Sequence, residues 1–258
     1  MTSAAADPAS SYSTPRIHRA VIDMIGRLQP KLQAAHLDIG SGNGSLIRLV
    51  QRHFQVESRA CDYTSGLMEI PGQAVEVADL NHQPLPYGDD SFDLVTFTEV
   101  VEHLENHHDV CREIRRVLRP GGLLIVTTPN ILNLKSRLRF LFFGFWNLFG
   151  PLHVRESEKH TTGGHINPIS YFYLAHALSD AGLQIRGFGV DQYQRSSLLP
   201  LILLYLPIRW MGFLAFRKER DKYRTVDAHN SGMVKAMNTI PMLLGRTIVV
   251  AAERPEQD

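Results

Sequence analysis

The stretch that decides the fold is Leu37-Asp38-Ile39-Gly40-Ser41-Gly42-Asn43-Gly44, an apolar strand that runs directly into three glycines at alternate positions. A strand followed by a glycine-rich turn and a helix start is typical of a nucleotide site. Glycine lets the backbone approach a ligand closely, and the helix N-terminus offers unpaired N–H groups. The spacing narrows the choice of ligand. A dinucleotide fingerprint reads G-x-G-x-x-G, whereas this turn reads G-x-G-x-G, which disfavours a nicotinamide dehydrogenase.

Short apolar runs alternate with amphipathic segments along most of the chain. The pattern predicts strands over 35–39, 56–61, 74–78, 92–98, 123–128, 183–190 and 246–253. It predicts helices over 15–28, 45–54, 105–118 and 168–181. Strands that alternate with helices at this spacing indicate an α/β fold, in which a parallel sheet is covered on both faces. Such sheets bind ligands at the carboxyl ends of their strands.

Length and composition limit the remaining possibilities. The 258 residues suit one domain over 15–258, preceded by a tail over 1–14 that is expected to be disordered and does not resemble a signal peptide. Lysine and arginine number 27 against 26 aspartates and glutamates, so no nucleic-acid partner is expected. Cys61 and Cys111 fall in a predicted strand and a predicted helix, which makes a disulfide unlikely and favours a cytoplasmic location.

The motifs around the glycine turn resemble those of class I S-adenosylmethionine (SAM)-dependent methyltransferases of the type 11/23-like group. The resemblance extends from Ala35 to Pro129 and includes the strand 91–97 after an acidic loop, and the Pro-Gly-Gly turn and strand over 118–126. It implies a Rossmann-like fold whose seven-stranded sheet is mostly parallel with an antiparallel last strand. It also implies SAM as cofactor, with the protein chiefly positioning an already activated methyl group.

The resemblance assigns cofactor roles to individual residues. Asp38 would anchor the SAM amino group through the loop, and Asp79 would reach the adenine amino group. By analogy with dinucleotide-binding sheets, Asp62, at the end of the second predicted strand, would accept hydrogen bonds from the ribose hydroxyls. A simpler interpretation makes Asp62 a solvated loop aspartate and Asp79 a turn-forming one. The predicted cofactor set is Asp38, Gly40, Ser41, Gly42, Gly44, Asp62, Tyr63, Asp79, Leu80 and Glu99.

The segment Glu99-Val100-Val101-Glu102-His103 follows the fourth predicted strand. If it forms the first turn of a helix, residues 99, 102 and 103 share one face. They would then contact the methionine half of SAM and the acceptor, with His103 as general base. Alternatively, Glu99, Glu102 and His103 would hold Mg²⁺ or another divalent metal, with His160 or His165 as a further ligand. A structural role remains as a third possibility, because the helix dipole favours carboxylates in a first turn.

This segment resembles those of two groups, ubiquinone-biosynthesis O-methyltransferases and small-RNA 3′-end 2′-O-methyltransferases. A looser likeness, over 128–144, points to methyltransferases of glycan and lipopolysaccharide pathways. The catalytic set predicted on these grounds is His103, Glu99 and His165, of which His165 follows a glycine pair and is placed on a loop that closes over substrate. Asn130 is expected at the mouth of the acceptor pocket.

Two apolar insertions, over about 130–165 and 192–241, are expected to form a lid over the acceptor. Their uncharged runs, Phe140 to Val154 and Ser196 to Ile208, are shorter than the roughly 20 residues of a transmembrane helix, and Pro200 and Pro207 interrupt the second. No span is therefore expected. Basic residues flank both runs, which suits contact with a lipid-linked substrate or the inner face of a membrane as well as it suits a simple lid.

The sequence therefore predicts SAM-dependent O-methylation of a hydroxyl on a hydrophobic or lipid-linked acceptor, such as a quinone precursor, a glycolipid or a glycan. Two rival functions stay open: N- or C-methylation of a small metabolite, and a SAM-binding subunit without catalysis of its own.

Overall fold

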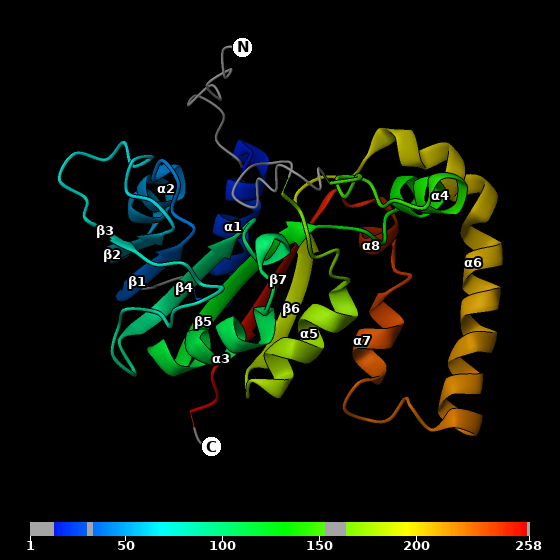
Figure 1. Ribbon diagram of the computed structural model, residues 1–258. Coiled ribbons are helices and arrows are strands. Elements are labelled where there is room, and N and C mark those ends of the chain that lie inside the picture. Colours follow the sequence, from blue (N-terminus) through cyan, green and yellow to red (C-terminus); the bar gives the residue numbers. More distant parts are fainter. Residues whose placement is uncertain (1–12, 30–32, 153–163, 257–258) are drawn as a thin grey trace, which may run out of the picture.

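A seven-stranded sheet organises the protein, whose computed structural model describes residues 13–29, 33–152 and 164–256 (Figure 1). The strands lie in the order β3 (Val75–Val77), β2 (Gln55–Asp62), β1 (Gln33–Ile39), β4 (Phe92–Thr98), β5 (Leu118–Pro129), β7 (Thr247–Glu253) and β6 (Gln184–Val190). β7 pairs antiparallel with both of its neighbours, and the other pairings are parallel. The predicted fold class is confirmed. Residues 1–12 of the predicted tail lie outside the described ranges.

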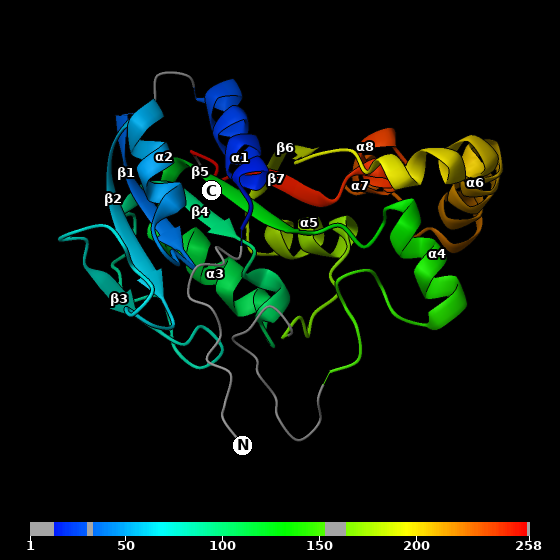
Figure 2. The same ribbon diagram turned by 90° about the horizontal axis from the view of Figure 1, so that it is seen from above.

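Helices cover both faces of the sheet (Figure 2). α1 (Pro15–Leu28) and α2 (Ser45–His53) lie on one face, and α3 (His107–Val117) and α5 (Tyr171–Asp180) lie on the other. Side chains alternate between the faces of a strand, so each central strand supplies both cores. Leu94 and Ile125 pack with α1 and α2, whereas Val95 and Val126 pack with α3 and α5. This burial on both faces explains why the strands are continuous apolar runs.

The strand order reverses between β1 and β4. From β1 the chain proceeds outward to β2 and β3, and it then returns to place β4 and β5 on the other side of β1. The carboxyl ends of β1 and β4 therefore flank the switch point of the sheet, where α/β folds bind ligands. The glycine turn follows β1 and Glu99 follows β4, so two of the predicted motifs meet there.

Most predicted boundaries hold within a few residues, and the largest shift is at β5. This strand begins at Leu118 instead of residue 123, because Leu118 pairs with Phe92 and a register shift separates that pair from the rest of the ladder. The predicted cap of α1 is confirmed, since the Thr14 hydroxyl accepts a hydrogen bond from the Ile17 N–H. Cys61 and Cys111 are free and buried.

The two insertions lie together beyond the β6 edge of the sheet (Figures 1 and 2). Their helices are α4 (Leu134–Phe143), η2 (Arg195–Ser197), α6 (Leu198–Lys218), the π-helical turn η3 (Glu219–Tyr223), α7 (Ser231–Ala236) and α8 (Ile240–Leu244).

The expectation that prolines divide the second run was wrong, because α6 is continuous over 21 residues with Pro207 inside it. Pro200 lies in the first turn, where its missing N–H costs nothing. Leu204, Tyr205 and Ile208, on both sides of Pro207, are half-buried. α6 also lies away from the switch point, so it does not form the predicted lid over the site.

Candidate cofactor and acceptor site

The three glycines of the turn all have positive φ, between +49° and +80°, but their surroundings differ. A Cβ on Gly40 would meet Val100 Cγ2 at 2.1 Å, and one on Gly44 would meet Ile70 Cδ1 at 2.7 Å. A Cβ on Gly42 would meet nothing within 4 Å. Gly40 and Gly44 are therefore required by packing within the protein, whereas Gly42 borders open space in which a ligand can approach the backbone.

Polar atoms border the same turn. Asp62, at the end of β2, accepts hydrogen bonds from the Gly42 N–H at 2.8 Å and the Thr64 N–H at 3.3 Å. The Ser41 hydroxyl is buried, and it has no hydrogen-bond partner among the described residues. Tyr63 is 42% exposed beside them. An open glycine cradle with a carboxylate and an unpaired hydroxyl fits the methionine and ribose halves of SAM.

Asp38 is fixed by a chain of hydrogen bonds that crosses three strands. Its Oδ1 accepts from the Thr96 hydroxyl at 2.6 Å, and Thr96 in turn contacts His36 Nε2 at 2.9 Å. His36 Nδ1 lies 3.0 Å from the Ser58 hydroxyl. Burial raises the pKa of Asp38 to about 7, with a contribution from the charge of Asp62, and burial lowers the pKa of His36 to about 3. No sequence pattern indicates this role for His36, which lies in the apolar strand β1.

Asp79 follows β3 and takes part in a local turn. Its Oδ1 accepts from the Asn81 N–H at 3.0 Å, and its Oδ2 lies 3.0 Å from the His82 ring nitrogen. These bonds match the turn-forming interpretation of Asp79. Leu80 is partly buried against the core. Adenine recognition by Asp79 and Leu80 stays a prediction.

Glu99 does not share a face with Glu102 and His103, so this part of the prediction was wrong. Glu99 has a φ of +55°, and only the 3₁₀ turn η1 (Val101–His103) follows it. Its Oε1 accepts a hydrogen bond from the Thr127 hydroxyl at 2.8 Å, which directs the side chain toward β5. Burial raises the pKa of Glu99 to about 7.

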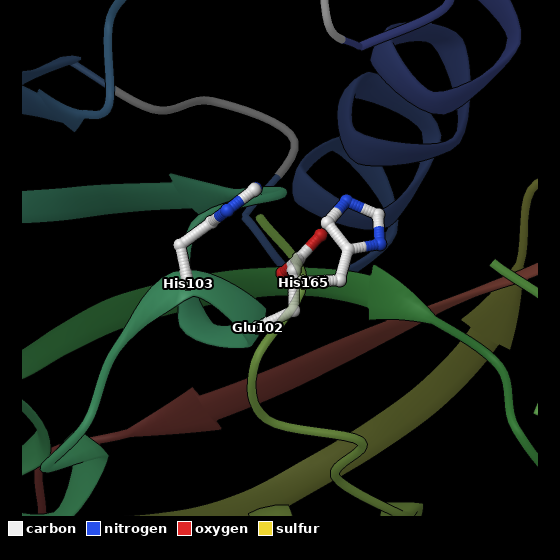
Figure 3. A group of neighbouring side chains, drawn as sticks. All are labelled: Glu102, His103 and His165. Atoms are coloured by element: carbon white, nitrogen blue, oxygen red, sulfur yellow. The ribbon is translucent and has the colours of Figure 1, made fainter. Parts of the chain in front are cut away.

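Glu102, His103 and His165 come together at the end of β4 (Figure 3). One potential ligand atom from each lies within 4.8 Å of the others, and the two imidazole centroids are 4.8 Å apart. Glu102 is fully buried, and its Oε2 accepts from the Thr128 hydroxyl at 3.1 Å. Its Oε1 has no hydrogen-bond partner in the parts of the chain that the structure describes. Burial and the charge of Glu99 raise the pKa of Glu102 well above its ordinary value.

Backbone hydrogen bonds bring His165 to this cluster from 62 residues along the chain. The N–H groups of Ile166 and Asn167 both donate to the Glu102 carbonyl, at 3.0 and 2.9 Å. His165 is thereby placed beside His103 at the end of the first insertion. His160, the other predicted ligand, lies outside the described residues.

Carbonyl oxygens fix the protonation of both imidazoles. His103 Nδ1 lies 3.1 Å from the Gly164 oxygen, and His165 Nδ1 lies 3.0 Å from the Leu148 oxygen. Because a carbonyl only accepts, each Nδ1 carries a proton and each Nε2 is the basic nitrogen. Burial also lowers the pKa of His165, which favours the neutral form. The cluster therefore holds two imidazoles in the tautomer that accepts a proton or binds a metal through Nε2.

Asn130 is not at the mouth of a pocket, and that expectation was wrong. It is 3% exposed, and its amide donates to the carbonyls of Met242 and Gly245 at 2.9 Å each. Its Oδ1 accepts from the Leu132 N–H at 2.9 Å. Asn130 joins the start of the first insertion to the end of the second.

Comparison with known proteins places these motifs in a family. Residues 37–126 match the model of a methyltransferase domain. A probable SAM-dependent methyltransferase of Mycobacterium tuberculosis is 34% identical over 137 residues, which are 50% of this chain and 46% of that protein. A ubiquinone/menaquinone biosynthesis C-methyltransferase of Hahella chejuensis is 26% identical over 159 residues, 56% of this chain and 59% of that one. The chain thus matches about half the length of these curated relatives.

The structural match covers more of the chain than the sequence match does. A SAM-dependent methyltransferase from Archaeoglobus fulgidus superposes with a TM-score of 0.55 over 92% of this chain and 94% of its own, at 15% identity. The match to the family model ends at residue 126, within β5, so it covers the strands around the switch point and neither insertion.

Proposed function

We propose that this chain, whose residues 37–126 match a methyltransferase domain, is a class I SAM-dependent methyltransferase and transfers the methyl group of SAM to a hydroxyl on a hydrophobic or lipid-linked acceptor. The observation that supports this most is the pair of imidazoles, His103 and His165, whose basic Nε2 atoms lie at the carboxyl end of the sheet. A hydroxyl must lose its proton to attack a methyl group, and an imidazole accepts a proton near neutral pH.

The chain's own residues have distinct tasks in this proposal. The glycine turn and Asp62 hold SAM, which supplies a methyl group already activated by its sulfonium. His103 or His165 accepts the proton of the acceptor hydroxyl at Nε2. The Gly164 and Leu148 carbonyls keep each ring in the required tautomer and stabilise its protonated form. Phe149, whose ring lies 5.2 Å from that of His165, supplies an apolar wall from the first insertion.

A metal-assisted version has one specific observation in its favour. The unpaired, fully buried Oε1 of Glu102 lies in the group formed with His103 and His165, and a divalent cation would satisfy it. The ligands would then be Glu102, His103 and His165, and Glu99 would not take part. A bound cation would acidify the acceptor hydroxyl. Calorimetric titration of Mg²⁺ and Mn²⁺ into wild type and His165→Ala tests this version, which requires heat that the variant lacks.

The experiment that tests the proposal compares two acceptors with one head group, a catechol with and without a polyprenyl tail, using radiolabelled SAM. We expect faster turnover of the tailed catechol. We expect His103→Ala or His165→Ala to lower kcat by about 100-fold while S-adenosylhomocysteine still binds. Activity on soluble polar acceptors alone would contradict the hydrophobic acceptor.

The same variants separate the rival functions. Methylation at nitrogen or carbon of a small metabolite predicts that both histidines can be replaced without loss of kcat. A non-catalytic SAM-binding subunit predicts normal S-adenosylhomocysteine affinity and no turnover of any acceptor.

A further inference from the structure

The helix α6 has two apolar faces, and only one of them contacts the protein. Its inner stripe is half-buried against the rest of the insertions and consists of Leu201, Leu204, Tyr205, Ile208, Gly212 and Phe216. Its outer stripe is exposed by between 56% and 77% at Leu199, Ile202, Leu203, Leu206, Trp210 and Phe213. Positions 199, 203, 206, 210 and 213 recur at intervals of three and four residues, and Ile202 lies next to Leu203, so the six lie on one side of the helix.

The exposure of α6 is inconsistent with a core helix. The segment Arg195–Tyr223 is long enough to cross a membrane, and its apolar window of 18 residues has a mean hydropathy of 1.8, but that window is 0% buried. A core helix of this composition would be mostly buried, and a signal sequence would lie near the N-terminus, whereas α6 lies between β6 and β7. The neighbouring helix α4 adds Leu141 and Phe142, which are 71% and 82% exposed. α4 and α6 together form an exposed apolar surface that needs a partner.

The charged residues at the end of α6 indicate which kind of partner covers this surface. The segment 209–224 holds six lysines and arginines against Glu219 and Asp221, in a chain that is otherwise close to neutral. Arg217 continues the outer stripe by one turn, and the remaining cations follow at the end of α6. An apolar stripe that ends in a cationic cluster matches the acyl chains and anionic headgroups of a bilayer. A second copy of the chain would instead bring two cationic clusters together in a parallel pairing.

We infer that the outer stripe of α6 lies in the plane of an anionic lipid bilayer, buried among its acyl chains, with Arg217 to Arg224 at the headgroups. The inner stripe stays packed against the protein, so α6 lies along one leaflet and does not cross it. The α4 aromatic residues enter the same leaflet beside it. The inference extends the proposed function by giving a reason for a lipid-linked acceptor, but its test involves no methyl transfer.

The experiment uses the full chain with vesicles of phosphatidylglycerol or phosphatidylcholine. Flotation should carry the protein with the phosphatidylglycerol vesicles, and added salt should weaken that binding because it screens the cations. Leu203→Glu should weaken partitioning at least about tenfold, because it places a charge at the centre of the stripe. The matched control is Val77→Glu, since Val77 is 57% exposed on β3, at the opposite edge of the sheet. That variant should float as wild type does.

Fluorescence locates the contact within the chain. Trp146 and Trp210 are the two tryptophans, and Trp146→Phe leaves Trp210 alone while a ring still stacks on Phe140. The emission of Trp210 should shift to the blue on vesicles and be quenched by brominated acyl chains.

Three results would overturn the inference. The first is absence of flotation, or equal flotation of Leu203→Glu and wild type when both melt at the same temperature. The second is an oligomer that Leu203→Glu converts to a monomer without vesicles, which would make the stripe an interface between copies. The third is wild-type protein that resists extraction at high pH and needs detergent to stay in solution, which would mean that α6 spans the bilayer.

Discussion

Replacing Gly42 with alanine tests whether the glycine turn holds the cofactor. The added methyl group meets nothing within 4 Å in the protein, so no clash opposes folding. The backbone remains at a φ of +49°, where alanine costs about 1–2 kcal/mol relative to glycine. For a domain of this size that corresponds to a lowering of Tm by about 2–8 °C.

The effect on binding should be larger than the effect on stability. A ligand that packs against the Gly42 backbone would find a methyl carbon inside the contact distance of about 3.5–4.0 Å, so it must move away and lose its contacts. We expect calorimetry to show at least about tenfold weaker binding of S-adenosylhomocysteine, which is about 1.4 kcal/mol.

Gly144→Ala is the matched control. Gly144 ends α4 with a φ of +75°, and a Cβ there also meets nothing within 4 Å. It should show the same loss of Tm and unchanged binding. If Gly42→Ala bound S-adenosylhomocysteine as tightly as wild type, the assignment of this turn as the cofactor cradle would be refuted. If both variants bound it more weakly, the loss could not be assigned to contact with the added methyl group at Gly42.

Three further outcomes are expected. Asp62→Asn removes the charge and keeps only one of the two oxygens that accept from the Gly42 and Thr64 N–H groups, so it should weaken S-adenosylhomocysteine binding about tenfold and lower stability by about 1–3 kcal/mol; equal affinity would remove Asp62 from the ribose site. The pKa of His36 is about 3 in the folded protein and 6.5 in the unfolded chain. The contribution of His36 to the free energy of unfolding is therefore fully present above pH 6.5, and it is lost as the pH falls toward 3, because the unfolded chain then binds a proton that the folded protein does not. Denaturant unfolding should therefore show the advantage of wild type over His36→Gln shrinking by about 2 kcal/mol between pH 7.5 and pH 5, and a constant difference would contradict the buried neutral imidazole. Asn130→Ala leaves the Met242 and Gly245 carbonyls without their hydrogen-bond donor, so it should lower the free energy of unfolding by about 2–4 kcal/mol in the same assay. A loss below about 0.5 kcal/mol, the size of a neutral surface change, would show that the insertions do not depend on this amide.

Local patterns predicted the sheet and the glycine turn because both depend on residues close together in the sequence. Continuous apolar runs identified the strands, and alternate glycines identified the turn between β1 and α2. The cap of α1 likewise depends on neighbours, Thr14 and Ile17.

The candidate catalytic cluster depends on contacts that no local pattern contains. Glu99 was assigned to a helical face, but its positive φ and its bond to Thr127 on another strand direct it away. His165 reaches His103 because two N–H groups of a later loop bond to the Glu102 carbonyl. α6 also continues through Pro207, although the intrinsic cost of proline inside a helix predicts a break there.

Both insertions leave the sheet at one corner of the molecule, and the second also returns there. The Asn130 N–H donates to the Arg246 carbonyl, and the Arg246 N–H donates to that of Gln192, so both insertions depart and the second returns within a few ångströms. The first insertion is tied back at Glu102, in the turn η1 that follows β4. The segments between these anchor points can therefore be exchanged as units while the sheet and its glycine turn stay unchanged. A chimaera that exchanges residues 131–163 and 193–244 for those of another methyltransferase would preserve cofactor affinity while changing which acceptor reaches the imidazoles.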